Sequence, residues 1–190
     1  MEKQKTTIIT YDKARSAEDL RQILDLQQAN LPKHISDQEQ KEQGFVTVEH
    51  NFELLSSMYH VAPQIIARHE GQVIGYALVM LKSFADQIPV LIPMFEMLAT
   101  LSYQNKAIDD YAYFVMGQVC VGKAYRGQGV FDGLYQAQKE HLSNTYDFVV
   151  TEVATRNTRS LRAHERLGFK TIHTFKEPQE EWAIVLWDWT

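Results

Sequence analysis

The chain has 190 residues, of which 45% are hydrophobic and 23% are charged, and its formal net charge is −5 at pH 7. This length is enough to bury one sizeable core, and the composition excludes a disordered protein. A net negative charge also disfavours a nucleic-acid binder, which would need a basic surface. We therefore expect one soluble domain over residues 1–190.

The cysteine content and the N-terminal sequence bear on the compartment. Cys120 is the only cysteine, which excludes an internal disulfide and a cysteine-based zinc site and fits a reducing compartment. We interpret it as a small buried strand residue rather than a nucleophile. Residues 1–5 are polar, and no apolar run reaches membrane-spanning length. We expect a cytoplasmic protein with no signal peptide and no membrane contact.

The N-terminal third predicts a strand and two helices. Thr6–Asp12 has the composition of a strand, and Ser16 is a typical N-cap for a first helix that ends near Asn30. A polar, glutamine-rich stretch over 36–43 follows. Apolar residues at helical spacing over 52–59 then predict a second helix.

The next segment predicts a hairpin and an insertion. Residues 64–69 and 73–81 are strand-like runs separated by Glu70-Gly71-Gln72, which indicates a β-hairpin. Residues 82–110 are too long for a simple connection, and we expect a helical insertion there. Its apolar side chains either cover a sheet edge, which we favour, or form part of a substrate wall or a dimer contact; they are Val90, Leu91, Ile92, Phe95 and Leu98.

The central segment predicts a strand, a glycine turn and a helix. Residues 111–121 are apolar almost throughout, which suits a fourth strand buried on both faces. In the turn that follows, Gly127 and Gly129 let backbone N–H groups approach a ligand, and the helix over 130–142 adds the positive end of its dipole. The turn therefore favours phosphate oxygens; the alternative is that it uses glycine for its backbone angles alone and binds nothing. A strand over 148–153 follows the helix.

Other phosphate and metal motifs are excluded. No Gly-x-x-x-x-Gly-Lys run followed by Ser or Thr is present, and Asp132 stands where a dinucleotide-binding turn needs a third glycine. His164 lacks a second histidine at the spacing of a His-Glu-x-x-His helix, so no metal site is expected.

Two blocks of sequence resemble the GCN5-related N-acetyltransferases. The acetyl-CoA loop of that family reads Arg or Gln, two residues, Gly, one residue, then Gly or Ala, and Arg126, Gly129 and Phe131 occupy those positions. Phe131 is a departure, because a small residue is usual there. A second block follows at the family's spacing, with Glu152-Val153-Ala154-Thr155-Arg156-Asn157, Ser160, His164 and Leu167-Gly168-Phe169. The resemblance covers roughly residues 115–175.

This resemblance implies an α/β fold with a mixed, mostly antiparallel sheet flanked by helices, and acetyl-CoA in the cleft after the fourth strand. It implies that Val119, Cys120 and Val121 offer backbone N–H groups to the thioester carbonyl and the pantetheine arm. Asn157 would hydrogen-bond the same arm, cap a helix, or do both. The residues implied to wrap the pyrophosphate are Gly127, Gln128, Gly129, Val130, Phe131 and Asp132, and Arg126 belongs to the same cofactor-binding loop.

The resemblance also assigns catalytic roles. Glu152 stands where some family members carry the general-base glutamate; the alternative is a carboxylate paired with a nearby arginine. His164 stands where the family commonly places the tyrosine that protonates the thiolate, and it is either that acid or inert. Four arginines, most of which share one side of a helix beginning near Thr158, form either a solvated face or a site for the phosphates of CoA; they are Arg156, Arg159, Arg162 and Arg166.

The prediction is an N-acetyltransferase that moves an acetyl group from acetyl-CoA directly to a primary amine of a small molecule or peptide. The alternative is a noncatalytic acyl-CoA-binding or regulatory module, and a third, weaker interpretation is an interaction protein that merely has this fold. In the family, the C-terminal strands, here over 170–175 and 182–188, often shape acceptor specificity. Trp182, Trp187 and Trp189 belong either to that region or to a homodimer contact.

Overall fold

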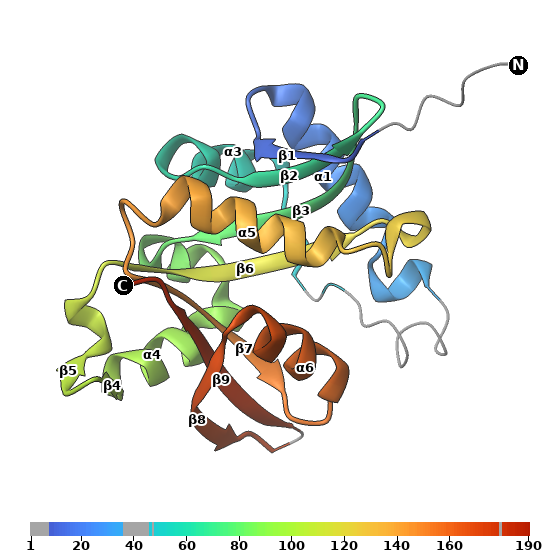
Figure 1. Cartoon of the computed structure of the whole chain (residues 1–190). Coiled ribbons are helices and arrows are strands. Elements are labelled where there is room, and N and C mark those ends of the chain that lie inside the picture. Colours follow the sequence, from blue (N-terminus) through green and yellow to red (C-terminus); the bar gives the residue numbers. More distant parts are fainter. Residues whose placement is uncertain (1–7, 36–45, 47, 179) are drawn as a thin grey trace, which may run out of the picture. The chain divides into compact units, whose positions relative to one another are not determined.

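The computed structural model describes residues 8–35, 46, 48–178 and 180–190 (Figure 1). The helices are α1 (Ala17–Ala29), α3 (Phe52–Val61), α4 (Ile92–Thr100), α5 (Val130–Leu142) and α6 (Thr158–Leu167). The strands are β1 (Thr10–Lys13), β2 (Ile65–His69), β3 (Gln72–Met80), β4 (Ser102–Tyr103), β5 (Lys106–Ala107), β6 (Tyr113–Val121), β7 (Phe148–Ala154), β8 (Lys170–Lys176) and β9 (Glu181–Asp188).

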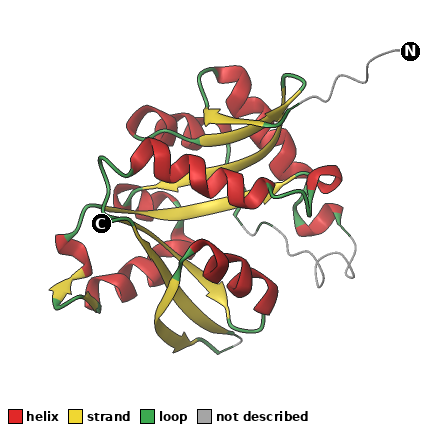
Figure 2. Cartoon of the chain, in the orientation of Figure 1, coloured by secondary structure: helices red, strands yellow, loops and turns green. Residues whose placement is uncertain are grey.

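The sheet is mixed and mostly antiparallel, with helices flanking it, as predicted (Figure 2). Its strand order is β1-β2-β3-β6-β7-β9-β8, while β4 and β5 pair separately. The pairs β1–β2, β2–β3, β7–β9 and β8–β9 are antiparallel, and β6 runs parallel to β7. Within the described residues, no helix is long and apolar enough to cross a membrane.

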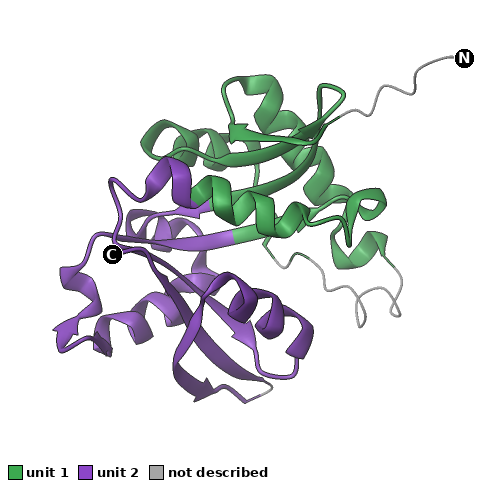
Figure 3. Cartoon of the chain, in the orientation of Figure 1, with its two compact units in different colours: residues 1–78, 118–138 green, residues 79–117, 139–190 purple. Residues whose placement is uncertain are grey.

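The chain divides into two compact units (Figure 3). Unit 1 comprises residues 1–78 and 118–138, and unit 2 comprises residues 79–117 and 139–190. Strand β6 and helix α5 each contribute residues to both units.

In unit 1, the predicted elements follow their local signals. The Ser16 hydroxyl accepts a hydrogen bond from the Asp19 N–H at 3.2 Å, so Ser16 caps α1 as predicted. The turn between β2 and β3 places Gly71 at φ +81°, a conformation that glycine adopts without strain. The first strand is observed from Thr10, while Thr6 and Thr7 of the prediction, and the stretch over 36–43, lie outside the described residues.

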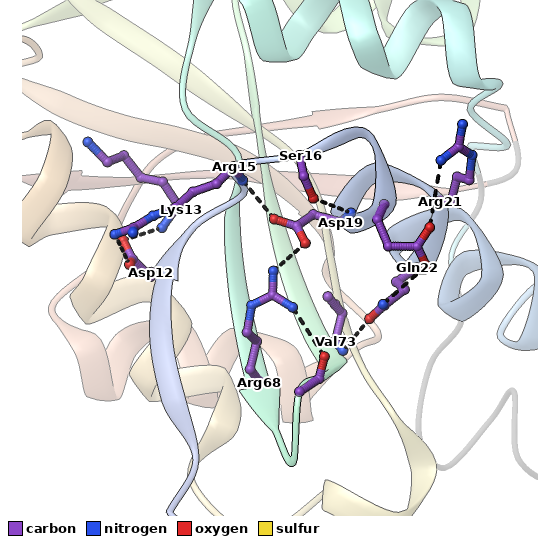
Figure 4. A network of polar contacts seen from close by, with 11 residues as sticks. Asp12, Lys13, Arg15, Ser16, Asp19, Arg21, Gln22, Arg68 and Val73 are labelled. Carbon is purple, nitrogen blue, oxygen red and sulfur yellow. Dashed lines mark hydrogen bonds and ion pairs between the residues drawn. The ribbon is translucent and has the colours of Figure 1, made fainter.

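A buried carboxylate ties α1 to the β2–β3 hairpin (Figure 4). Asp19 is only 4% exposed, and it accepts hydrogen bonds from the Arg15 N–H, at 2.7 Å, and from the Arg68 guanidinium, with which it forms an ion pair. Arg68 also donates to the carbonyl of Gly71 at 3.3 Å. Burial acts to raise the pKa of Asp19, but the bonds from Arg68, Arg15 and Ser16 outweigh it and hold that pKa below its usual value.

Asp19→Asn is expected to destabilise the protein by about 2 kcal/mol at pH 7, because a charge-assisted hydrogen bond to Arg68 is lost. Since the pKa of Asp19 is lowered by folding, this contribution is present at neutral pH and is lost as the pH falls through the folded-state pKa. Urea unfolding at pH 7 and pH 3 should show the gap to wild type shrinking in acid. Glu18→Gln is the control, because its contact with Arg21 is exposed and should be worth less than about 0.5 kcal/mol. An equal gap at both pH values would contradict this account.

In unit 2, the segment over 82–110 contains α4, the short pair β4–β5 and 3₁₀ helices at Lys82–Gln87, Pro89–Leu91 and Ile108–Asp110. Of its apolar side chains, Phe95 and Leu98 are buried at 3% and 0% exposure, whereas Val90 is 66% exposed. The buried side chains of α4 therefore anchor this segment in the core of unit 2.

The C-terminal half of unit 2 has a well-packed aromatic core. Gly168 ends α6 at φ +107°, and a Cβ there would come within 3.0 Å of the Trp187 indole nitrogen. Trp187 is 7% exposed and its ring lies 5.6 Å from that of Phe169. Trp187 is thus a core residue, while the Trp182 indole donates to Glu177 at 3.1 Å.

The predicted burial of the fourth strand on both faces is correct for only part of β6. Phe114, Val115 and Met116 are buried in succession, and the parallel register joins Tyr113–Val115 to Phe148–Val150. From Gly117 on, exposure alternates between half-buried and buried positions. The second half of β6 therefore has the alternating burial of a strand that is covered on one face.

Candidate functional site

The residues predicted to form the site come from both units. Residues 119–132 belong to unit 1, and Glu152, Asn157 and His164 belong to unit 2. Among the described residues, no group of three or more His, Cys, Asp or Glu side chains could hold a metal ion.

The glycine turn of unit 1 presents unpaired backbone donors. Gly127 and Gly129 have φ of +75° and +78°, are exposed, and have no atom within 4 Å of where a Cβ would stand. The N–H groups of Gly127, Gln128 and Gly129 have no protein acceptor within the part of the chain that the structure describes. Helix α5 begins directly after them, with Gly133 N–H donating to the Gly129 carbonyl at 3.0 Å. Successive free N–H groups beside a helix N-terminus form a concave anion site.

Arg126 braces this turn. Its Nε donates to the Val121 carbonyl at 3.1 Å and its guanidinium donates to the Asn30 side chain at 2.5 Å. The Asn30 amide in turn donates to the Leu26 carbonyl at 2.8 Å. The Gly122 N–H donates to the Ile74 carbonyl at 2.8 Å. These bonds fix the turn to the end of β6, to β3 and to the last turn of α1.

The side chains around the turn pack within unit 1. Cys120 is 6% exposed, and burial raises its pKa to about 11, so the thiol stays protonated at neutral pH and is a buried strand residue, as predicted. Phe131, which departs from the family's small residue, contacts the Tyr135 ring one turn further along α5, with 4.9 Å between centroids. Val119 and Val121 are half-buried.

Glu152 has the most strongly raised carboxyl pKa of unit 2. It lies on β7 opposite Ile184 of β9, and burial together with the nearby Glu177 carboxylate raises its pKa to about 7. Within the described residues, its side chain has no hydrogen bond or ion pair, and Arg156 pairs with Glu180 instead. The alternative of a structural Glu152–arginine pair therefore has no support. A carboxylate with this pKa can take up a proton near neutral pH.

His164 lies in a packing environment. It is 3% exposed, its ring meets Phe169 edge-on at 4.9 Å, and its Nδ1–H donates to the Ser160 carbonyl at 2.8 Å. Burial outweighs this hydrogen bond and lowers the pKa of His164, so the ring is neutral and its one proton is already held by a backbone carbonyl. This geometry favours the inert role over the role of general acid.

His164→Phe is therefore expected to leave kcat within about threefold of wild type, because a positioned proton donor would contribute about a hundredfold or more. The phenylalanine ring keeps the contact with Phe169, and the titratable imidazole nitrogens of His164 are removed. Thiol release from acetyl-CoA measures kcat, and a thermal melt checks the fold. A loss of kcat beyond tenfold in a folded variant that still binds acetyl-CoA would restore His164 as the acid.

Asn157 caps α6, because its side chain accepts a hydrogen bond from the Ser160 N–H at 3.0 Å. The N-cap alternative is confirmed, and a bond to the pantetheine arm stays a prediction. Of the arginine set, Arg156 forms an exposed ion pair with Glu180. This pairing favours the solvated-face interpretation for that residue.

The match to a family model decides the identity of the fold. The model described as "Acetyltransferase (GNAT) family" matches residues 20–169. The chain belongs to the GNAT acetyltransferase family.

Solved structures agree with this assignment to the GNAT fold. The ribosomal-protein-S18-alanine N-acetyltransferase from Escherichia coli is 12% identical, with a TM-score of 0.61 over 95% of this chain and 94% of that chain. The NatC complex bound to Gag peptide and CoA is 15% identical, with a TM-score of 0.62 over 96% and 99%. A putative acetyltransferase from Salmonella typhimurium with its cofactor acetyl-CoA is 14% identical, with a TM-score of 0.61 over 96% and 95%. No protein of curated function matches the chain in sequence.

The sequence analysis of this GNAT chain missed one cluster. Gln27, His50, Tyr76 and Gln118 form a buried hydrogen-bond network in unit 1. Gln118 gave a signal, because it interrupts an otherwise apolar strand, and Gln27 stands on the buried side of α1. Their partnership joins residues far apart in the sequence, which periodicity cannot show.

Proposed function

We propose that this chain is an acetyl-CoA-dependent N-acetyltransferase that acts on a primary amine of a small molecule or peptide. The observation that carries the proposal is Glu152, a carboxylate with a pKa raised to about 7 and no bonded partner in the described chain, on the strand where the family resemblance expects the base. Family membership supplies the reaction class, and the free N–H groups of Gly127, Gln128 and Gly129 suit a phosphate-bearing cosubstrate.

In this proposal, the turn over 127–132 binds the pyrophosphate of acetyl-CoA, and the end of β6 offers backbone N–H groups to its thioester and pantetheine arm. Glu152 takes a proton from the ammonium, directly or through water. The neutral amine nitrogen then attacks the thioester carbonyl, the new N–C bond forms, the nitrogen gives up a second proton to solvent, and the C–S bond breaks. The departing thiolate takes its proton from solvent, and no covalent enzyme intermediate forms.

The open space at the turn supports the fit. Gly127 and Gly129 are exposed and have nothing within 4 Å of their Cβ positions, so an approaching phosphate would meet no side chain on that side of either residue. The structural relatives justify peptide N-termini among the candidate acceptors, since one is an alanine N-acetyltransferase and another is bound to a peptide. We also propose a cytoplasmic location, which fits the single buried thiol, and the homodimer stays a prediction.

The test is release of free thiol from acetyl-CoA in the presence of a panel of amines and peptides, with the acetylated product identified by mass. Transfer to at least one amine supports the proposal. Binding of acetyl-CoA without transfer to any acceptor would favour the noncatalytic acyl-CoA-binding module. No binding at all would leave only an interaction protein with this fold.

A further inference from the structure

Asn30 is a buried polar residue that connects the end of α1 to the glycine turn within unit 1. It directly follows the last residue of α1 and is 6% exposed. It stands 96 positions before Arg126 in the sequence, yet a hydrogen bond of 2.5 Å joins the two side chains. A buried amide is costly unless both its oxygen and its nitrogen have partners, so the partners of Asn30 indicate its role.

The hydrogen bonds of Asn30 fix the orientation of its amide. Its Nδ2 donates to the Leu26 carbonyl at 2.8 Å, one turn back along α1, so its Oδ1 is the atom that accepts from Arg126. The opposite orientation would set the oxygen against a carbonyl and the nitrogen against a guanidinium. The backbone N–H of Asn30 donates to the Gln27 carbonyl at 2.9 Å. The end of α1 therefore holds this oxygen in one place.

Arg126 has two acceptors on one edge of its guanidinium group. Nε donates to the Val121 carbonyl at 3.1 Å, and Nη2 donates to Asn30 Oδ1. Nε and Nη2 lie on the same edge of the planar group, so acceptors at both atoms fix its position and its plane. With the bond to Val121 alone, the group could still turn about its side-chain bonds. Asn30 therefore supplies the second point that holds the guanidinium in place.

The bond from Arg126 to Val121 links the two ends of the segment that leads into the turn. Val121 is the last residue of β6, and Arg126 directly precedes Gly127, where the run of N–H donors begins. The Arg126 side chain thus sets how these donors are oriented relative to the end of β6. An anion site with donors that are already oriented binds more tightly, because less conformational freedom is lost on binding.

We propose that Asn30 is a positioning residue for acetyl-CoA binding: it holds the Arg126 guanidinium on the Val121 carbonyl and thereby orients the N–H donors of the turn. Asn30 acts through Arg126 and not on the cosubstrate itself. This inference rests on the proposed function, in which the turn binds the pyrophosphate. In the rival account, Asn30 only ends α1, and the turn is held by Tyr125, whose hydroxyl is hydrogen-bonded to His69 Nδ1 at 3.0 Å.

Two substitutions of Asn30 separate these accounts. Asn30→Asp keeps an oxygen for Arg126 but loses the donor to the Leu26 carbonyl, whereas Asn30→Leu is similar in size and loses both. Both variants should melt below wild type. In calorimetric titration, the dissociation constant for acetyl-CoA is expected to rise by less than about threefold in Asn30→Asp and by about tenfold in Asn30→Leu, because only the second loses a hydrogen bond to a charged group.

Asn51→Leu is the matched control. Asn51 also bonds a backbone group at the end of a helix in unit 1, because its oxygen accepts from the Leu54 N–H at 2.8 Å. This variant should melt below wild type and still bind acetyl-CoA as wild type does. A loss of binding as large as in Asn30→Leu would mean that any destabilisation of unit 1 suffices, and would overturn the proposal.

Two results at Asn30 itself would also overturn the proposal. Equal losses of binding in Asn30→Asp and Asn30→Leu would show that Asn30 only ends α1. Wild-type binding by Asn30→Leu would show that the turn is held without Asn30.

A second measurement separates this inference from the proposed function. In protein labelled with ¹⁵N-arginine, the Nε–H signal that disappears in Arg126→Lys belongs to Arg126. Its exchange with solvent is expected to be at least about tenfold faster in Asn30→Leu than in wild type or Asn30→Asp, because the guanidinium is then held at one point only. If wild type binds no acetyl-CoA, the proposed function fails, and this exchange rate alone decides whether Asn30 positions Arg126. Equal exchange in wild type and Asn30→Leu would overturn the inference.

Discussion

Replacing Glu152 with Gln is expected to lower kcat/KM for acetyl transfer by about a hundredfold to a thousandfold, because a positioned general base contributes about that much. In the wild type, Glu152 must be ionised to accept the proton. Its pKa is raised to about 7, so activity should rise with pH through that value. The variant should lose this limb of the profile, which thiol-release rates between pH 5 and 9 will show.

Two controls make the Glu152 prediction specific. Glu177→Gln removes the neighbouring carboxylate that helps to raise the pKa of Glu152, so the rise of activity with pH should occur at lower pH in this variant without loss of activity.

Folding raises the pKa of Glu152, so the stability that the protonated Glu152 side chain contributes to the wild type is lost as the pH rises through about 7. Glu152→Gln should therefore melt no lower than wild type at pH 8. An unchanged pH profile in Glu152→Gln would remove Glu152 from the mechanism.

Replacing Gly129 with Glu is expected to weaken acetyl-CoA binding by at least about a hundredfold. The φ of +78° strains any side chain there, and the new carboxylate would stand beside the N–H groups that should hold phosphate. The new carboxylate would repel the phosphates of acetyl-CoA and would also occupy the space that they need. Calorimetric titration with acetyl-CoA measures the loss.

Gly71→Glu is a closely matched control for this change. Gly71 also has a positive φ, of +81°, also has nothing within 4 Å of its Cβ position, and lies in the same unit at the β2–β3 turn. It brings the same backbone strain and the same charge to a site where no ligand is expected. If both variants bound acetyl-CoA as tightly as the wild type, the assignment of the phosphate turn would be contradicted. If both lost binding to the same extent, the cause would be backbone strain rather than the phosphate site.

The sequence predicted most of the elements because their ends are marked by local chemistry. Ser16 and Asn157 have the side-chain oxygens of an N-cap, and Gly71 supplies the positive φ of its turn. The glycine turn could be located because Gly127 and Gly129 stand between an apolar strand and an amphipathic helix. These signals act over a few residues and can be followed along the chain.

The contacts that the sequence did not predict are those between distant residues. The ion pair between Asp19 and Arg68, and the Gln27–His50–Gln118 network, depend on how helix and strands meet. The burial of His164 against Phe169 is of the same kind, and it changes the balance between the two roles that the sequence left open for that histidine. The raised pKa of Glu152 also comes from tertiary burial, although its position on the strand was anticipated.

Calorimetric titration of the wild-type protein with acetyl-CoA tests the central claim most directly. The free N–H groups of the turn and the membership in the GNAT family predict saturable binding of one acetyl-CoA per chain, weakened by salt because the phosphates carry the attraction. Absence of binding, together with no rise in melting temperature at millimolar acetyl-CoA, would contradict the proposed function.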